Sequence, residues 1–174
     1  DTTIIDCGGT RYNPHRAFTL HNKEAGTSKI IGFTIINGYT AGAVGGNGAV
    51  PGFPQSDEED AGTTANGGAD ATGDGYGGSI LLDGASPLIQ HCVIMDSTVT
   101  GGQGGDGNNG FPIYGGDTNG QWGGVGADGF GDGFGGAIAC VDTNTSDNAV
   151  GSNPTILNCV IKNNKARGGC GGNG

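Results

Sequence analysis

Residues 68–80 read GADATGDGYGGSI, and residues 126–138 read GADGFGDGFGGAI. Each residue of the first stretch lies 58 positions before its counterpart in the second (126 − 68 = 58). Self-similarity at a fixed period is the sequence signature of proteins that stack one structural unit on the next. A short apolar segment follows each copy, and no helical pattern lies between them, so the repeat predicts short stacked β-strands.

A second element occurs three times and fixes how the strands stack. Its copies are SKIIGFTIIN (28–37), PLIQHCVIMD (87–96) and PTILNCVIKN (154–163). In each copy two residues separate the first shared apolar position from the second, and one residue separates the second from the third. Because a plain strand would leave one residue each time, a corner must lie in the first gap. The alignment predicts three vertical ladders, formed by Ile30, Ile89 and Ile156; by Phe33, Cys92 and Cys159; and by Ile35, Ile94 and Ile161.

The residues at the predicted corners suit a sharp bend. The first corner carries Gly32, His91 and Asn158, and the next carries Asn37, Asp96 and Asn163. Gly, Asn, Asp and His are the residue types that most readily adopt left-handed backbone angles. The two sets therefore predict left-handed corners on either side of a short strand.

Glycine dominates two long stretches and leaves little sequence for a large core. Residues 41–78 and 101–136 hold 29 of the 41 glycines. They also hold ten acidic residues and no Lys or Arg, so they carry the whole formal charge of −10. Such a surface lacks the basic footprint that nucleic-acid binding needs. No apolar run approaches the ~20 residues of a membrane-spanning helix, so no membrane insertion is expected.

The two Gly-rich stretches admit two interpretations. Gly-rich tracts usually behave as flexible linkers. Here, however, the period extends into them, because Gly52-Phe53-Pro54 returns as Gly110-Phe111-Pro112. Repetition within a loop favours two loops of one conformation lying on each other. Their aromatic anchors would be Phe53, Tyr76, Phe111, Trp122 and Phe134.

Several of these segments resemble the repeats of right-handed parallel β-helix proteins of the pectin-lyase-like superfamily. The resemblance is carried by GGSI (77–80), GGAI (135–138) and NPTILNCVIKNNKA (153–166), and it is greatest to polymorphic outer-membrane proteins and related bacterial surface proteins. The repeats of that family alternate a GGAI element with a Phe-x-x-Asn element. This sequence departs from the pattern, with Val160 or Ile161 where that Phe would stand.

The repeat and the resemblance together predict an all-β chain. The expected fold is a right-handed parallel β-helix, a solenoid of about three coils, with the Gly-rich loops 41–78 and 101–136 between coils. Residues 1–174 are expected to form one segment of a longer chain or array, because Asp1 already adjoins a predicted strand. An antiparallel sandwich with long loops is the alternative.

Four carboxylates recur among the glycines as two pairs, Asp70 with Asp74 and Asp128 with Asp132. Stacked loops would bring these side chains together, and Gly-rich turns also offer backbone carbonyls. Carboxylates and carbonyls are the ligands that calcium prefers, so calcium is a candidate ligand, although the fold requires no cofactor. The alternative is that these Asp residues only cap turns.

Five cysteines raise the question of disulfides or a metal site. They are Cys7, Cys92, Cys140, Cys159 and Cys170. The separation of stacked Cys92 and Cys159 would permit a bridge, but parallel side chains suit its dihedral angle poorly, which favours buried free thiols. No Cys-x-x-Cys spacing suggests zinc.

The sequence favours a non-catalytic function. Lys29 and Lys162 share no column, and no carboxylate–base constellation of the kind a lyase needs repeats along the chain. The resemblance implies a secreted, extracellular or cell-surface module, of bacterial type, for adhesion, matrix or fibre assembly. Its partners would be further copies, joined end to end or through the loops. The alternative is a carbohydrate-binding or polysaccharide-degrading β-helix, a lyase or hydrolase, that holds glycans against Tyr12, Tyr39 or Trp122.

Overall fold

The computed structural model describes residues 3–21, 23–24, 27–47, 68–69, 73–107, 126–142 and 151–173. Within these ranges every regular element is a β-strand. The strands are β1 (Thr3–Asp6), β2 (Phe18–Leu20), β3 (Lys29–Ile31), β4 (Phe33–Ile36), β5 (Tyr39–Ala41), β6 (Gly75–Tyr76), β7 (Ile80–Asp83), β8 (Leu88–Gln90), β9 (Val93–Met95), β10 (Thr98–Thr100), β11 (Gly133–Phe134), β12 (Ile138–Val141), β13 (Thr155–Leu157), β14 (Val160–Lys162) and β15 (Lys165–Arg167).

The chain forms two compact units. The first comprises Asp1–Ala41, Asp74–Thr100 and Gly133–Arg167, and the second comprises Gly42–Gly73, Gly101–Asp132 and Gly168–Gly174. All fifteen strands belong to the first unit. The sequence predicts a single segment with two loops, and the second unit is made largely from those loops.

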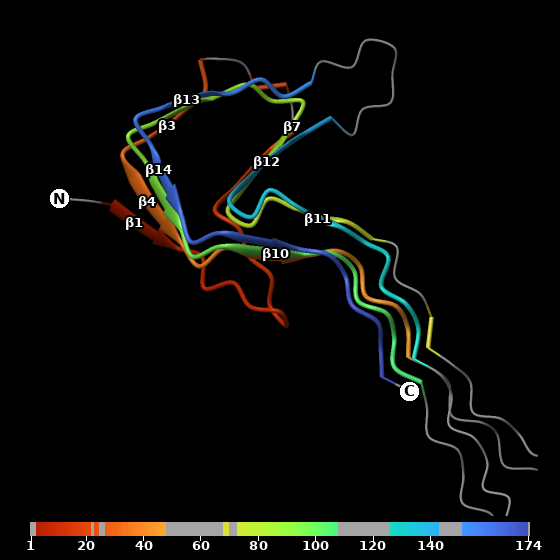
Figure 1. Ribbon diagram of the computed structural model, residues 1–174. Helices are drawn as coiled ribbons and strands as arrows, with labels where there is room; N and C mark the ends of the chain where they lie inside the picture. The colour runs from red at the N-terminus through yellow and green to blue at the C-terminus, as the bar shows by residue number, and fades with distance from the viewer. Residues whose placement is uncertain are drawn as a thin grey trace, which may run out of the picture. The chain divides into compact units, whose positions relative to one another are not determined.

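The strands of the first unit form five sheets, which the chain visits in a fixed order (Figure 1). Sheet 1 has the order β1-β4-β9-β14, sheet 2 has β5-β10-β15, sheet 3 has β6-β11, sheet 4 has β2-β7-β12, and sheet 5 has β3-β8-β13. From β4 onward the chain passes through sheets 1 to 5 and then returns to sheet 1. Every pairing is parallel. An all-β chain with parallel sheets is therefore confirmed for the described residues, and the antiparallel alternative is wrong there.

Isoleucine ladders form the core of the first unit. Ile89 pairs with Ile30 on one side and with Ile156 on the other. Ile94 pairs in the same way with Ile35 and Ile161. These are the pairs that the alignment predicts. Ile35, Ile89 and Ile94 are 0% exposed, because each lies between two strands with its side chain on the inner face.

The third ladder brings two thiols together at the edge of the same core. Cys92 is 1% exposed and packs in the core cluster, with Cys159 and Phe33 against it. The backbone N–H of Cys92 donates to Sγ of Cys159 over 3.4 Å. Both cysteines are free thiols, as expected for side chains that point in parallel from stacked strands.

The predicted corners are confirmed by the backbone angles. Gly32, His91 and Asn158 have φ values of 76°, 53° and 51°. The second set, Asn37, Asp96 and Asn163, has φ values between 56° and 57°. Corner side chains also bond along their column, since Nδ2 of Asn158 lies 3.3 Å from Nε2 of His91.

The second unit is held together by backbone hydrogen bonds between extended Gly-rich segments. Residues 42–47, 101–107 and 168–173 run in one direction, and residues 68–69 and 126–132 run in the other (Figure 1). The N–H groups of Gly104 and Gly107 donate to Cys170 and Asn173, while those of Gly102 and Gly105 donate to Gly73 and Ala69, over 2.7–3.0 Å. Bonding residues are spaced by three, which is the period of a polyproline II helix.

Glycine is needed in this unit because the segments approach one another closely. A Cβ atom on Gly101 or Gly104 would overlap the carbonyl oxygen of Gly131 or Ala127. Gly42 and Gly45 meet carbonyl oxygens in the same way, again three residues apart. The N–H of Gly45 donates to the carbonyl of Gln103 over 2.8 Å. The described parts of the two loops therefore lie on each other, as the repeat predicts.

Candidate functional site

The predicted calcium ligands are divided between the two units. Asp74 belongs to the first unit and Asp128 and Asp132 to the second, while Asp70 lies outside the described residues. Among the residues that the structure describes, no group of three or more His, Cys, Asp or Glu side chains is arranged to hold a metal ion. The calcium hypothesis therefore has no assembled ligand set in the described part of the chain.

Asp74 instead accepts a hydrogen bond from a tyrosine. The Tyr76 hydroxyl donates to Oδ2 of Asp74 over 2.9 Å. This hydrogen bond, with smaller contributions from burial and from the carboxylate charge, raises the pKa of Tyr76. The bond joins two side chains and is therefore neither a metal ligation nor a turn cap.

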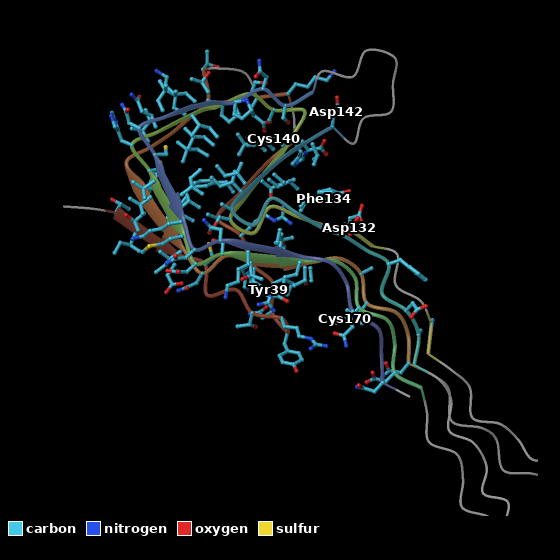
Figure 2. All side chains as sticks on the ribbon, in the orientation of Figure 1. Tyr39, Asp132, Phe134, Cys140, Asp142 and Cys170 are labelled. Atoms are coloured by element: carbon cyan, nitrogen blue, oxygen red, sulfur yellow. The ribbon has the colours of Figure 1, made fainter. Side chains whose placement is uncertain are left out.

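Tyr76 also forms one step of an aromatic column. Its ring stacks on that of Phe134, with centroids 5.3 Å apart and planes inclined by 13°. Figure 2 shows Phe134 on β11, the strand that pairs with β6. Phe134 is 44% exposed, so one ring face remains accessible. The other predicted aromatic anchors, Phe53, Phe111 and Trp122, lie outside the described residues.

A polar ladder in the second unit was missed by the sequence analysis. Oδ1 of Asn47 accepts from the N–H of Asp106 over 3.1 Å, and Oδ1 of Asp106 accepts from the N–H of Asn173 over 2.8 Å. The signal was present, because 47, 106 and 173 are separated by 59 and 67 positions. The corner column of Asn37, Asp96 and Asn163 has the same two separations. This ladder ties three passes of the chain together.

The remaining thiols lie outside the ladders. Cys140 and Cys170 are exposed, and Cys7 is half-buried. Burial raises the pKa of the Cys7 thiol, with a further contribution from Asp6. Although the Cys140 residue is exposed, its thiol is partly desolvated by its neighbours, and this raises its pKa. A raised pKa keeps these groups protonated and lowers their nucleophilicity at neutral pH. Neither has the character of an activated cysteine.

Aromatic and basic side chains gather near sheet 2. Tyr12 is 91% exposed, and the Arg11 guanidinium carbon lies 5.8 Å from its ring centroid. The segment that carries them bridges to sheet 2 through His15 and Tyr39, whose N–H donates to the His15 carbonyl over 2.8 Å. Tyr39 lies on the outer side of that sheet (Figure 2). These groups are able to stack on a sugar ring and to bind a carboxylate.

Arg16 is a half-buried basic residue that precedes β2. Its Nη1 is buried and has no partner among the described residues. Burial lowers the pKa of Arg16.

No protein-family model, curated protein or solved structure matches the chain. No helix in the described part of the chain is long and apolar enough to cross a membrane. What the chain does must therefore be inferred from its own strand pairings, end strands and surfaces.

Proposed function

We propose that this chain is part of a right-handed parallel β-helix that serves as a rigid extracellular or cell-surface module in adhesion, matrix or fibre assembly. The fixed order of sheets and the ladders of identical side chains support it. In such a β-helix each pass of the chain forms backbone hydrogen bonds with the pass before it. The module would then act through its rigidity, that is, through its resistance to bending and to unfolding. A link to the pectin-lyase-like superfamily belongs to the same proposal.

The observation that carries this proposal is the unbroken parallel pairing of sheet 1 across four passes of the chain. Ile156 and Ile161 are 41% and 47% exposed, whereas Ile89, one pass earlier, is 0% exposed. On β1 the inward residue Ile5, which pairs with Ile35, is half-buried, whereas Ile35 is 0% exposed. Unpaired strand edges bearing apolar residues are templates for further strands. We therefore propose that copies associate end to end.

The open edge can be blocked without touching the rest of the sheet. The N–H of Val160 donates to Cys92, and the C=O of Lys162 accepts from Asp96. Because backbone groups alternate sides along a parallel strand, Ile161 between them presents its N–H to the open edge. Ile161→Pro removes that donor, and Ile161→Val keeps it.

Sedimentation velocity at rising concentration tests the end-to-end contact. We expect open-ended growth for the wild type and for Ile161→Val, and a loss of growth for Ile161→Pro. A wild-type chain that never grows beyond a small closed oligomer would contradict end-to-end assembly.

A carbohydrate-binding or polysaccharide-degrading function is the second candidate. The exposed ring of Tyr12 beside Arg11, and the outward position of Tyr39, favour it. Binding to and product release from uronic-acid polymers, measured with calcium and with chelator, test it. If the protein shows no binding and no turnover, with calcium and with chelator, this candidate is eliminated.

A further inference from the structure

The outer face of sheet 1 carries a group of apolar side chains. Side chains alternate along its strands, so Ile35 and Ile94 point inward while their neighbours point outward. Two outward columns result, and both run across all four strands. One contains Ile4, Thr34, Val93 and Val160, and the other contains Asp6, Ile36, Met95 and Lys162.

The two columns make one continuous patch with a charge at each end. Its centre consists of Thr34, Ile36, Val93 and Met95, which are half-buried, and Ile4 and Val160 at its ends are 60% and 52% exposed. Contiguous exposed apolar side chains of this kind mark interaction surfaces. The outer face of sheet 2, by contrast, carries Thr98 and Thr100 and ends in Lys165 and Arg167.

We propose that the outer face of sheet 1 binds the same face of a second copy, with the two stacks antiparallel. This side-by-side contact goes beyond the end-to-end association proposed above and does not depend on it. The pair is isologous: a two-fold axis parallel to the strands relates the two copies. Each copy then covers the apolar columns of the other.

The charges select this arrangement. Asp6 and Lys162 stand at opposite ends of one outward column. When that column meets its own reversed copy, Asp6 lies opposite Lys162 of the second copy, and this happens twice in the pair. Ile36 then lies opposite Met95 of the second copy. If the two stacks ran parallel, Asp6 and Lys162 of one copy would lie at the same levels as Asp6 and Lys162 of the other. Neither charge would then face its opposite.

The size of the face sets the strength of the contact. Two strands of four residues and two of three, at about 3.3 Å per residue and about 4.8 Å between strands, cover roughly 220 Å². A stable interface buries about 800 Å² per partner. The pair is therefore expected to form only at high protein concentration.

The central test places a charge in the middle of the face. Met95→Glu puts a carboxylate beside Lys162 of its own chain, where the folded monomer accommodates it, and opposite Ile36 of the second copy, where it is buried unpaired. Gln90→Glu is the matched control, because Gln90 is a half-buried outward residue of the same pass on sheet 5. Lys162→Glu tests the end pairs, since it would face Asp6 of the second copy.

Sedimentation equilibrium of the full chain, from about 10 µM to about 1 mM, measures the result. We expect a monomer–dimer equilibrium for the wild type and for Gln90→Glu, weakened at least tenfold by Met95→Glu and about fivefold by Lys162→Glu. Circular dichroism melting checks that each variant is folded.

Two results would overturn the proposal. One is a wild type that stays monomeric over the whole range, or dimerises equally with Met95→Glu and Gln90→Glu. The other is growth that Ile161→Pro stops and Met95→Glu does not, because that pattern assigns all association to the strand edges and leaves the end-to-end proposal standing.

Discussion

The two units of this chain stack successive passes through different contacts, side chain to side chain in the first and backbone to backbone in the second. In the first unit the interior is filled by side chains, and Ile35, Ile89 and Ile94 are 0% exposed. In the second unit the segments pack backbone against backbone. Gly101 and Gly104 have no side chain, and their α-carbons lie close to carbonyl oxygens of the neighbouring segment. The first unit gains its stability mainly from apolar burial, and the second mainly from backbone hydrogen bonds made at close approach.

The difference shows that one repeat period can build two kinds of interior. Passes in the first unit are aligned by side-chain ladders with a strand period of two. Passes in the second unit are aligned by N–H groups spaced by three, such as those of Gly102 and Gly105. The comparison predicts that the units respond to different substitutions, and the experiments below measure this in order of expected effect.

The largest effect is expected from a cavity in the first unit. Ile94→Ala removes the central side chain of a ladder, between Ile35 and Ile161. We expect it to lower the free energy of unfolding by about 2–5 kcal/mol, measured by denaturant titration followed by circular dichroism. The control is Thr34→Ala, an outward position of the same sheet, which should change stability by less than about 0.5 kcal/mol. Equal losses for both would mean that the ladders are not the core.

A methyl group added to the second unit is expected to have the next largest effect. In Gly104→Ala the new Cβ would overlap the Ala127 carbonyl, so the segments must separate, at a cost of about 1–3 kcal/mol. Amide hydrogen exchange at Gly102 and Gly105 should then accelerate. Gly46→Ala is the matched control, since its Cβ would meet nothing within 4 Å. If both variants exchange alike, close approach is not what holds this unit together.

A corner substitution is expected to have a smaller effect. His91 has a φ of 53°, and a β-branched residue in that conformation costs about 1–2 kcal/mol. His91→Val should therefore lower the denaturation midpoint, whereas His91→Asn should stay within about 0.5 kcal/mol of the wild type. Asn158 occupies the same corner one pass later. A tolerated His91→Val would show that the ladders, and not the corners, fix the register.

Much of the first unit could be predicted from the sequence because its pattern is carried by side chains. Two residues between Ile30 and Phe33, where a strand leaves one, already required a corner at Gly32. The second unit could be predicted only in outline. Glycine shows that backbones approach closely, but it does not show which carbonyl each N–H reaches.

The polar contacts of the candidate sites were harder to predict, because they depend on which side chains lie close together in space. The offsets of 59 and 67 that join Asn47, Asp106 and Asn173 were legible in the sequence. The bond from Tyr76 to Asp74 was not, since a tyrosine two residues from an aspartate has no fixed orientation. Nor does a sequence show how far each inward side chain is covered, and Ile161 is 47% exposed although its ladder partner Ile94 is 0% exposed.

The smallest effect is expected from removing the hydrogen bond between Tyr76 and Asp74, one of the acidic residues of the repeat. The hydrogen bond to Asp74 raises the pKa of Tyr76, so the folded state keeps the phenol protonated to a higher pH than the unfolded state does. This bond's contribution to stability is therefore complete below the ordinary tyrosine pKa and is lost as the pH rises through the raised value. Asp74→Asn should lower the pKa of Tyr76 toward its ordinary value, as followed by phenolate absorbance.

The same titration decides between the hydrogen bond and calcium. Subtracting the absorbance of Tyr76→Phe isolates one tyrosine among the four in the chain. A calcium ion on Asp74 would occupy the acceptor and neutralise the carboxylate, so added calcium should lower the pKa of Tyr76 and raise the melting temperature together. If calcium changes neither quantity, Asp74 serves its own strand through Tyr76. Asp74 would then be explained by its hydrogen bond with Tyr76, with no ion required.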